Sequence, residues 1–370
     1  MRPVIESAPA ATVRASLLAI VIALIGASGG CASTSQPIAA DADPALRSSS
    51  PAATPAPTSE PTPAAESTPT PLLFRRPFAI APGRDGDLWF TEYHGDHLGR
   101  ITITGSVRHY KLSAEGIAER LAVGPDGGVW FTDPMGNRIG RLEPRDGTLA
   151  YYKLPNLDSG PAGITFGPDG NLWFTEHSGD RIGRLTPTGD LKEFRLSKGA
   201  GPADIVAGID NHLWFLEDRA NRIGRITTDG VVTEFPVPTK DSRPGSLTLG
   251  SDGNVWFTEL TGEHIGKVTP QGKVTEYSLP IKGVPFAITG AADGHLWITV
   301  PRSHGGAQTR AILRVTTAGV LTAFEPPAGA MPGFITSGPD GNLWFTQPNF
   351  KIARLTPDGQ LTTFDVMRAK

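Results

Sequence analysis

Carboxylates recur at one fixed position in this sequence, three residues after a tryptophan. The chain has seven tryptophans, and the residues at that position are Glu92, Asp133, Glu176, Glu217, Glu259, Val300 and Gln347. Carboxylates gathered around the mouth of a channel would attract a cation, and carboxylate oxygens are preferred ligands of Mg²⁺ and Ca²⁺. We therefore take Glu92, Asp133 and Glu176 as candidate metal ligands.

A basic residue recurs as well, once in every copy of the same pattern. These residues are Arg100, Arg141, Arg184, Arg225, Lys267, Arg314 and Arg354. If each lies opposite the acid across a hairpin, the two side chains form a cross-strand ion pair and the acids serve the fold. The metal-binding and the structural interpretation of the acids both stay open at this point.

The second copy departs from the others at a position that bears on function. It has Ala118-Glu119-Arg120 where most other copies have Pro, one further residue and a small residue. An acid beside a guanidinium can hold a polar ligand or take part in proton transfer. Glu119 and Arg120 are the candidate catalytic residues and also candidate ligand contacts. Phe78 and Phe286, at the equivalent of Glu119, would be apolar walls for a ligand or a plug of the channel.

Three further departures are confined to single copies. Asp204 in the fourth copy and Phe334 in the seventh stand where the other copies mostly have a small residue. The sixth copy carries an insertion, residues 301–308, that contains Arg302 and His304. Long loops on rigid scaffolds often bind ligands, so both are candidate ligand contacts. The alternative is a surface insertion without a binding role.

The elements that must position these residues are short strands. Successive tryptophans are separated by 41, 43, 41, 42, 41 and 47 residues, and an Asp precedes each by four positions. Gly follows that Asp in most copies, which indicates a tight turn. Runs that alternate with period two, such as Leu191 to Leu196, indicate strands. Each copy therefore predicts four short antiparallel strands.

A four-stranded repeat of this length with a fixed tryptophan is typical of a propeller blade. We expect an all-β fold, a seven-bladed β-propeller over residues 72–370, with the tryptophans packed between blades. The first copy begins with its inner strand near Phe78 and the last ends with its own outer strand at 361–366. The ring is therefore expected to close by blade-on-blade packing, without a swapped strand.

The N-terminal part of the chain predicts export. An apolar run from Leu17 to Ala27 follows Arg2 and Arg14 and is shorter than the ~20 residues that span a bilayer. Residues 1–31 are interpreted as an export signal that ends at a lipidated Cys31, and the alternative is an ordinary secretory signal. Residues 32–71, rich in Ala, Pro, Ser and Thr, are expected to be a disordered tether. The domain would thus be periplasmic or extracellular and anchored to a membrane through the lipid.

Composition excludes several classes of protein. The net charge is −3, so the clustered positive charge of a nucleic-acid binder is missing. The single cysteine excludes an intramolecular disulfide framework and a site of several thiolates. We expect a monomer whose partner is a small-molecule or peptide ligand.

The repeat resembles that of the virginiamycin B lyase (streptogramin B lyase) family. In the third copy the residues that carry this resemblance are Gly167-Pro168-Asp169-Gly170-Asn171-Leu172-Trp173-Phe174-Thr175-Glu176 and Arg181-Ile182-Gly183-Arg184-Leu185-Thr186-Pro187. The resemblance extends over all seven copies. It implies a propeller whose founding members open a cyclic depsipeptide antibiotic by elimination across an ester. A histidine would act in the proton transfers, and Mg²⁺ held by glutamates would be the cofactor.

The family's catalytic residues are not matched in this chain. The two histidine positions hold Phe286 and Gly333, and the position of the glutamate before the second histidine holds Met331. The family's last glutamate is also missing, since Thr346, Gln347 and Pro348 follow the final Trp-Phe pair. Two functions therefore remain open. The first is an envelope protein that binds a peptide, glycan or small molecule at the channel mouth. The alternative is a streptogramin B-type lyase with relocated residues, for which Glu92, Glu119 and Asp133 are the candidate acids; a protein-interaction scaffold is a weaker third.

Overall fold

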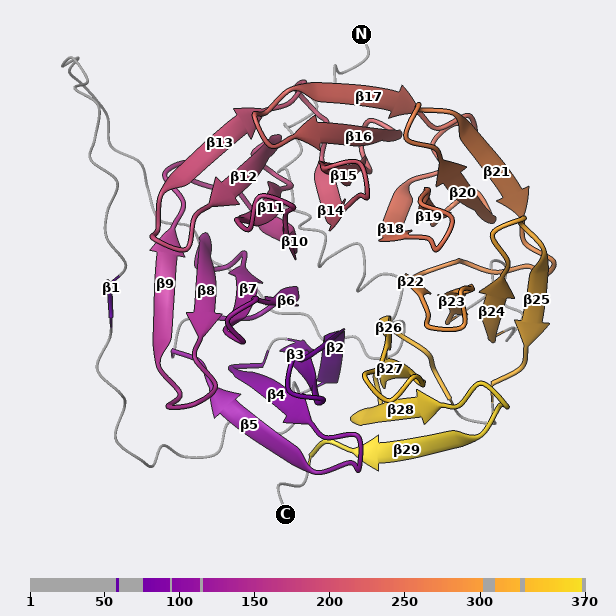
Figure 1. Ribbon diagram of the computed structural model, residues 1–370, viewed down its shortest axis with the longest axis horizontal. Coiled ribbons are helices and arrows are strands. Elements are labelled where there is room, and N and C mark those ends of the chain that lie inside the picture. The colour runs from indigo at the N-terminus through magenta and orange to yellow at the C-terminus, as the bar shows by residue number, and fades with distance from the viewer. Residues whose placement is uncertain are drawn as a thin grey trace, which may run out of the picture.

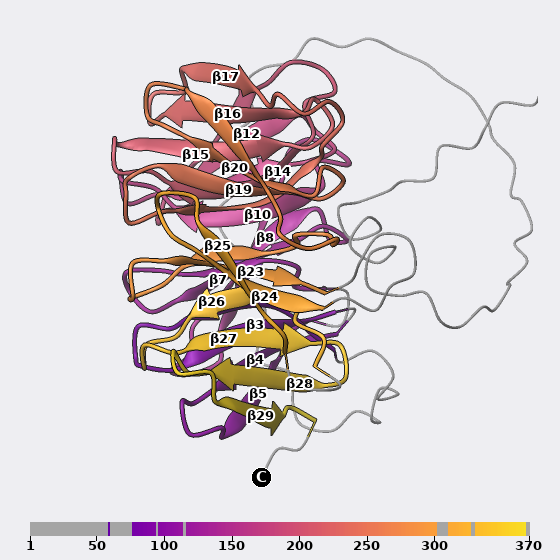
Figure 2. The same ribbon diagram turned by 90° about the vertical axis from the view of Figure 1, so that its right-hand side faces the viewer.

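The computed structural model describes residues 58–59, 76–93, 95–113, 116–301, 310–326 and 330–367. The predicted export signal with Cys31, most of the predicted tether, and Arg302 and His304 lie outside these residues. The described chain forms seven blades around a central axis, each a meander of four antiparallel strands (Figure 1). The predicted seven-bladed all-β propeller is confirmed, and edge-on the ring is a single layer of blades (Figure 2).

The strands follow the chain order from the inner to the outer edge of every blade. In blades one to three they are β2 (Arg76–Pro82), β3 (Leu88–Tyr93), β4 (His97–Ile101) and β5 (Val107–Lys111); β6 (Leu121–Val123), β7 (Val129–Asp133), β8 (Arg138–Leu142) and β9 (Leu149–Lys153); β10 (Pro161–Phe166), β11 (Leu172–Glu176), β12 (Arg181–Leu185) and β13 (Leu191–Arg195). In blades four and five they are β14 (Pro202–Ala207), β15 (His212–Glu217), β16 (Arg222–Thr227) and β17 (Val232–Pro236); β18 (Pro244–Leu249), β19 (Val255–Glu259), β20 (His264–Val268) and β21 (Val274–Ser278). In blades six and seven they are β22 (Ile288–Gly290), β23 (Leu296–Val300), β24 (Ala311–Val315) and β25 (Leu321–Phe324); β26 (Ile335–Ser337), β27 (Leu343–Gln347), β28 (Lys351–Leu355) and β29 (Leu361–Asp365).

A short strand from the segment before the ring joins blade two. The two residues of β1 (Thr58–Ser59) pair antiparallel with β9, Thr58 opposite Tyr151 and Ser59 opposite Ala150. The outer strand of a blade has one unpaired edge, and such an edge accepts another strand. No helix of the described residues is long and apolar enough to cross a bilayer.

Each tryptophan is held by contacts within its own blade. In blades three to seven its indole Nε1 donates to the Asp of the preceding turn, at 2.9 Å between Trp173 and Asp169 and 3.0 Å between Trp344 and Asp340. Its ring lies against an aromatic ring of the outer strand, as in the stacked pair of Trp173 and Phe194 at 5.4 Å between centroids. The Asp-Gly turn therefore both starts the second strand and orients the indole of that strand.

The phenylalanine after the tryptophan explains the glycine of the third strand. Phe174 lies opposite Gly183 on β12, and a Cβ atom on Gly183 would lie 2.1 Å from the ring. Because no side chain fits between the ring and the strand, the position requires glycine.

Threonine hydroxyls join the inner strands around the axis. In blades one, three, five, six and seven, the threonine two residues after the tryptophan accepts a hydrogen bond from its own inner strand and donates to a backbone carbonyl of the next blade. Thr175 Oγ1 accepts from Gly163 N at 2.8 Å and donates to Ala203 O at 2.9 Å. The same bond closes the ring, since Thr346 Oγ1 in blade seven donates to Phe78 O in blade one at 2.8 Å. Each blade is built of consecutive strands, so closure without a swapped strand is confirmed.

Blade four lacks this threonine, and Asp204 supplies another link in its place. Leu216 stands at the threonine position and has no hydroxyl. The carboxylate of Asp204 accepts from Ile205 N at 3.1 Å and from Leu247 N of blade five at 3.3 Å. The departure at Asp204 that the sequence marks as unusual is thus part of the joint between two blades.

Replacing Thr346 with valine should destabilise the protein at the closure of the ring. Thr346→Val keeps the shape of the side chain but leaves Phe334 N and Phe78 O buried without their partner. Leaving buried polar groups unpaired costs about 1–3 kcal/mol, and we expect a loss of that size in the free energy of unfolding measured by urea denaturation. The control is Thr363→Val, an exposed residue of β29, which should change the free energy by less than about 0.5 kcal/mol. Equal effects of the two substitutions would contradict the role of the hydroxyl.

Candidate functional site

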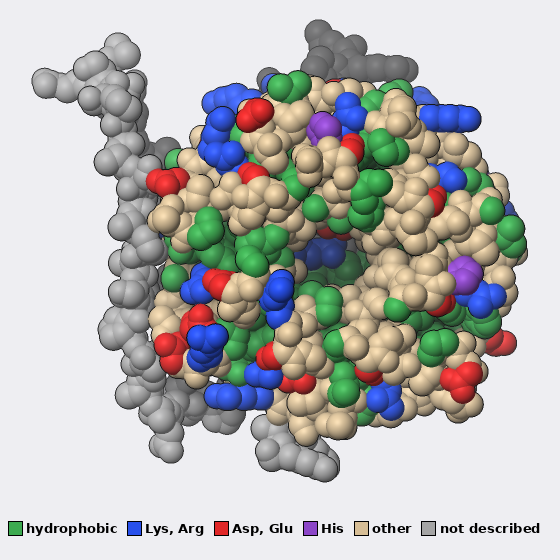
Figure 3. Space-filling view, viewed as in Figure 1, with side chains coloured by type: hydrophobic (Ala, Val, Ile, Leu, Met, Phe, Trp, Pro, Cys, Tyr) green, Lys and Arg blue, Asp and Glu red, His purple; other side chains and the backbone are tan. Residues whose placement is uncertain are grey.

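Residues from blades one, two, six and seven meet near the axis of the ring. We call Phe78, Tyr93, Glu119, Arg120, Phe286 and Phe334 the axial cluster. Five of the residues singled out from the sequence belong to it: Phe78, Glu119, Arg120, Phe286 and Phe334. One face of the ring is hollowed at its centre, where hydrophobic and basic side chains are visible (Figure 3).

The backbone of Glu119 and Arg120 is held by four hydrogen bonds. Glu119 N donates to Thr132 O, and Thr132 N donates to Arg120 O. Arg120 N donates to Thr132 Oγ1 at 3.1 Å, while Thr91 Oγ1 of blade one donates to Glu119 O at 3.0 Å. The two side chains therefore start from fixed positions just before β6.

The Glu119 carboxyl is buried, with 2% of the residue exposed, and its Oε1 has no hydrogen-bond partner. Burial raises its pKa to about 7, against the opposing effect of the Arg120 guanidinium. Burial and the charge of Glu119 also raise the pKa of the Tyr93 phenol. At neutral pH this carboxyl is thus divided between its acid and its carboxylate form.

Three phenylalanines form the apolar part of the cluster. The ring of Phe334 lies 4.8 Å from that of Phe78 and 4.8 Å from that of Phe286, and all three residues are buried. The guanidinium carbon of Arg120 lies 4.0 Å from the centroid of Phe334, a cation–π contact, and Arg120 Nε has no hydrogen-bond partner. Phe78 and Phe286 were expected to be either apolar walls for a ligand or a plug of the channel, and their contacts are those of a packed plug. Arg120 and Tyr93 are partly exposed.

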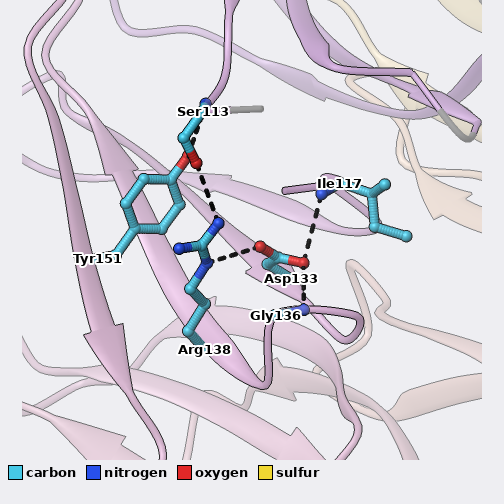
Figure 4. A network of polar contacts seen from close by, with 6 residues as sticks. All are labelled: Ser113, Ile117, Asp133, Gly136, Arg138 and Tyr151. Carbon is cyan, nitrogen blue, oxygen red and sulfur yellow. Dashed lines mark hydrogen bonds and ion pairs between the residues drawn. The ribbon is translucent and has the colours of Figure 1, made fainter. Parts of the chain in front are cut away.

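The recurring acids lie at the ends of the second strands, and each is buried in its own blade. Glu92, Asp133 and Glu176 have 1% or less of their surface exposed. Asp133 Oδ2 accepts from Arg138 Nε at 2.8 Å, and its Oδ1 accepts from Gly136 N and Ile117 N (Figure 4). Arg138 continues this network to Ser113, which lies beside the Tyr151 hydroxyl (Figure 4).

The acids do not pair with the recurring basic residues, so the expected cross-strand ion pairs are wrong. Arg184 lies opposite Trp173 across the two strands, and Glu176 lies opposite Arg181. The recurring basic residue is one strand-length away from the acid, where it pairs with the Asp of the turn, as Arg100 does with Asp85 at 2.6 Å. The offset arises because the basic residue follows the start of the third strand by three positions.

The acids of blades two to four pair instead with the first residue of the third strand, as Asp133 does with Arg138 at 2.8 Å and Glu217 with Arg222 at 2.7 Å. Further polar neighbours, which the sequence pattern did not reveal, come from the outer strands. The position opposite the third-strand glycine holds His109, Tyr151, Glu193, Glu234 and Glu276 in blades one to five. His109 Nδ1 lies 2.9 Å from Glu92 Oε1. The sequence did carry a signal for these neighbours. A polar residue recurs at the same position of the outer strand, opposite the third-strand glycine.

In blades three to five a buried glutamate of the second strand lies near a half-buried glutamate of the outer strand. Burial raises the pKa of Glu176 and Glu217 to about 7 and that of Glu259 to about 8, and in each case a second glutamate of the outer strand adds to the rise. Arg181 and Arg222 oppose the effect for the first two, whereas Glu259 has only the Ser242 hydroxyl to oppose it. Near neutral pH these carboxyls are thus partly protonated, chiefly because burial disfavours their charged form and secondarily because a second carboxylate lies close by.

The residues present do not fit the Mg²⁺ that the resemblance implies. In the described part of the chain, no three His, Cys, Asp or Glu side chains are grouped so as to hold a metal. Glu92, Asp133 and Glu176 lie in three different blades, each with partners of its own. Phe286, Gly333, Met331 and Gln347 offer no carboxylate or imidazole at the equivalent positions.

Comparisons with known proteins agree on one family. The model of the virginiamycin B lyase family matches residues 33–200 and 197–370. A streptogramin B lyase structure is 36% identical, with 80% of this chain and 95% of that chain covered and a TM-score of 0.71. A virginiamycin B lyase from Staphylococcus aureus is 37% identical, with 76% and 94% covered and a TM-score of 0.70. A catalytically inactive variant of that S. aureus enzyme with quinupristin is 37% identical, with 78% and 97% covered and a TM-score of 0.70. None of the curated proteins compared with the chain matches it significantly.

The buried glutamates predict that the protein becomes less stable as the pH rises. Their pKa values are raised from 4.5 to about 7 or 8, so between these values the folded protein binds more protons than the unfolded chain. The free energy of unfolding then decreases from about pH 4.5 to about pH 8. We expect a lower Tm at pH 9 than at pH 5, measured by circular dichroism, and a smaller drop in Glu259→Gln, which removes one titrating group.

The matched control is Glu263→Gln, whose carboxylate is partly exposed and paired with Lys282 at 3.0 Å. This variant should keep the full drop in Tm. An unchanged drop in Glu259→Gln would show that the buried carboxyl is not the source of the pH dependence.

Proposed function

This chain belongs to the virginiamycin B lyase family, and on that premise we propose that it binds a small-molecule or peptide ligand at the axial cluster. The observation that carries the proposal is the contact of Arg120 with Phe334, beside the buried acid Glu119. The guanidinium has an unbonded Nε and the carboxyl an unbonded Oε1. Buried polar atoms without partners are rare, and at a site they are the groups that a ligand can satisfy.

The chemistry of the cluster favours a ligand with both apolar and amide-like parts. The phenylalanines form a rigid apolar floor, and Arg120 and Tyr93 lie partly exposed above it. A guanidinium donates to carbonyl oxygens, and a carboxyl near its pKa either donates or accepts a hydrogen bond. A peptide or depsipeptide offers carbonyls, N–H groups and side chains in this combination.

A second candidate function is the opening of a cyclic depsipeptide ester, as in a streptogramin B-type lyase. The observation that favours it is the pKa of about 7 at Glu119, which suits a group that moves a proton at neutral pH. In such a step the Glu119 carboxylate would take the proton from the carbon next to the one that bears the ester oxygen. The carbon–oxygen bond would then break, leaving a double bond and a free carboxylate. Phe286 and Gly333 stand where the family has histidines, so this step would use a relocated base.

We further propose that the domain works outside the cytoplasm as a monomer. The apolar run before Cys31 supports export and lipidation, and the proline-rich residues 32–71 support a tether between the lipid and the ring. A tethered domain would meet ligands at the cell envelope.

The binding proposal is tested with quinupristin as the probe, by isothermal titration of the full chain. Arg120→Ala should weaken binding at least tenfold, about 1.4 kcal/mol, because the ligand loses its main donor. Arg195→Ala, at an exposed site of β13, is the control and should bind as the unaltered protein does. Binding that is equal in both variants, or no binding of the probe at millimolar concentration, would argue against the axial site for this class of ligand.

The lyase proposal is tested on the same probe by chromatography, because elimination changes no mass. We expect the rate of ring opening to rise through about pH 7 and to be lost in Glu119→Gln, while binding of the probe persists. Ring opening that survives in Glu119→Gln, or no opening by the unaltered protein with or without Mg²⁺, would remove this second function.

A further inference from the structure

A cavity of about 300 Å³ opens between blades one and two, away from the axial cluster. Its walls are the Asp-Gly turns of the two blades, the edge of Trp89 and the turn between β8 and β9. The charged side chains that line it are Arg84, Asp85, Arg100, Asp126, Glu143 and Arg145. None of them belongs to the axial cluster or to the buried carboxyl pairs.

At four other junctions the corresponding space is closed by a basic residue and an aromatic ring. Arg184, Arg225, Lys267 and Arg354 each donate to a backbone carbonyl in the next blade's turn, for example Arg225 to Pro270 O at 2.6 Å. An outer-strand ring also lies against the glycine of that turn, as Phe364 does against Gly105. Together the two contacts link the outer part of one blade to the turn of the next.

The turn of blade two is longer, and among the described residues neither of these contacts is made to it from blade one. Glu143 N donates to Thr148 O, five residues on, whereas Thr186 N in blade three donates to Asp190 O, four residues on. A Cβ atom on Gly147 would meet nothing within 4 Å, in contrast to Gly105. Arg100 turns back to Asp85 and Asp87 of its own blade, at 2.6 Å each.

The acidic side chains of the cavity are paired with arginines, whereas two of its arginines have no acidic partner in the residues that the structure describes. Asp85 pairs with Arg100 at 2.6 Å, and Asp126 and Glu143 pair with Arg141 at 2.8 and 3.4 Å. Within the described part of the chain, neither Arg84 nor Arg145 forms an ion pair, and both are exposed. The wall thus offers two guanidiniums without counter-charges, next to the apolar atoms of Val123, Pro125 and Pro144.

We propose that this cavity binds a small organic anion of sugar size, with its anionic group held by Arg84 and Arg145. Guanidinium groups bind carboxylate and phosphate through paired N–H donors, and either group would serve as the anion. A volume of about 300 Å³ is at the lower end of ligand pockets, which limits the ligand to a compact molecule.

The test uses isothermal titration of the full chain at low ionic strength with glucuronate, glucose 1-phosphate and neutral glucose. We expect binding of at least one anion, no binding of glucose, and a loss of at least tenfold in affinity in the double variant Arg84→Gln, Arg145→Gln. The matched control, Arg195→Gln with Lys198→Gln, removes the same charge from an exposed site on blade three and should bind as the unaltered protein does.

Comparison of the two anions distinguishes a carboxylate from a phosphate site. Equal binding of glucose, an equal loss in the control variant, or no binding of either anion at millimolar concentration would overturn the proposal. Quinupristin binding should be unaffected in the Arg84, Arg145 variant, so the result is independent of the axial site.

Discussion

The structure depends on a hydrogen bond from a threonine hydroxyl in one blade to a backbone carbonyl in the next. In the blades that have it, this threonine also accepts the N–H that the bulge of its own inner strand leaves free, as Thr175 does for Gly163. Inner strands are too far apart to share a ladder, so the hydroxyl acts as the bridge between sheets. Leu216 and Asp204 show how strictly the joint is kept, because a carboxylate bridges where the hydroxyl is missing.

This bond also explains how the scaffold is retained while its chemistry changes. The carbonyls that accept it belong to Phe78, Glu119, Ala203, Phe286 and Gly333, the residues eleven before a tryptophan. Only the backbone of these residues is used, so their side chains are free to differ. In this chain the five positions hold two phenylalanines, one glutamate, one alanine and one glycine.

The sequence predicts the fold because its repeat carries local chemistry at every step. Asp-Gly turns, alternating strands and one tryptophan per copy indicate blades, and the number of copies sets the number of blades.

Contacts across strands were harder to predict. The basic residues were matched to the wrong acids because an offset of three residues moves a side chain to the other end of a strand. The partners Glu193, Glu234 and Glu276 escaped notice because an inward polar residue in an outer strand looks like an ordinary surface position. Phe334 was noticed as an exception, but its contacts are made to other blades, with Phe78 across the seam of the ring and with Phe286 in blade six, and have no local signal.

The closure of the ring has a consequence for how such a chain can vary. Thr346 is bonded to Phe78 in the way that Thr175 is bonded to Ala203, and no strand is exchanged between the first and last blades. The seam is therefore built like the other joints that a threonine makes, and closure of the ring requires no special first or last blade. A gene rearranged so that translation began at another blade would still encode every joint. Within this architecture the order of the blades is fixed, but the place where the polypeptide enters is not.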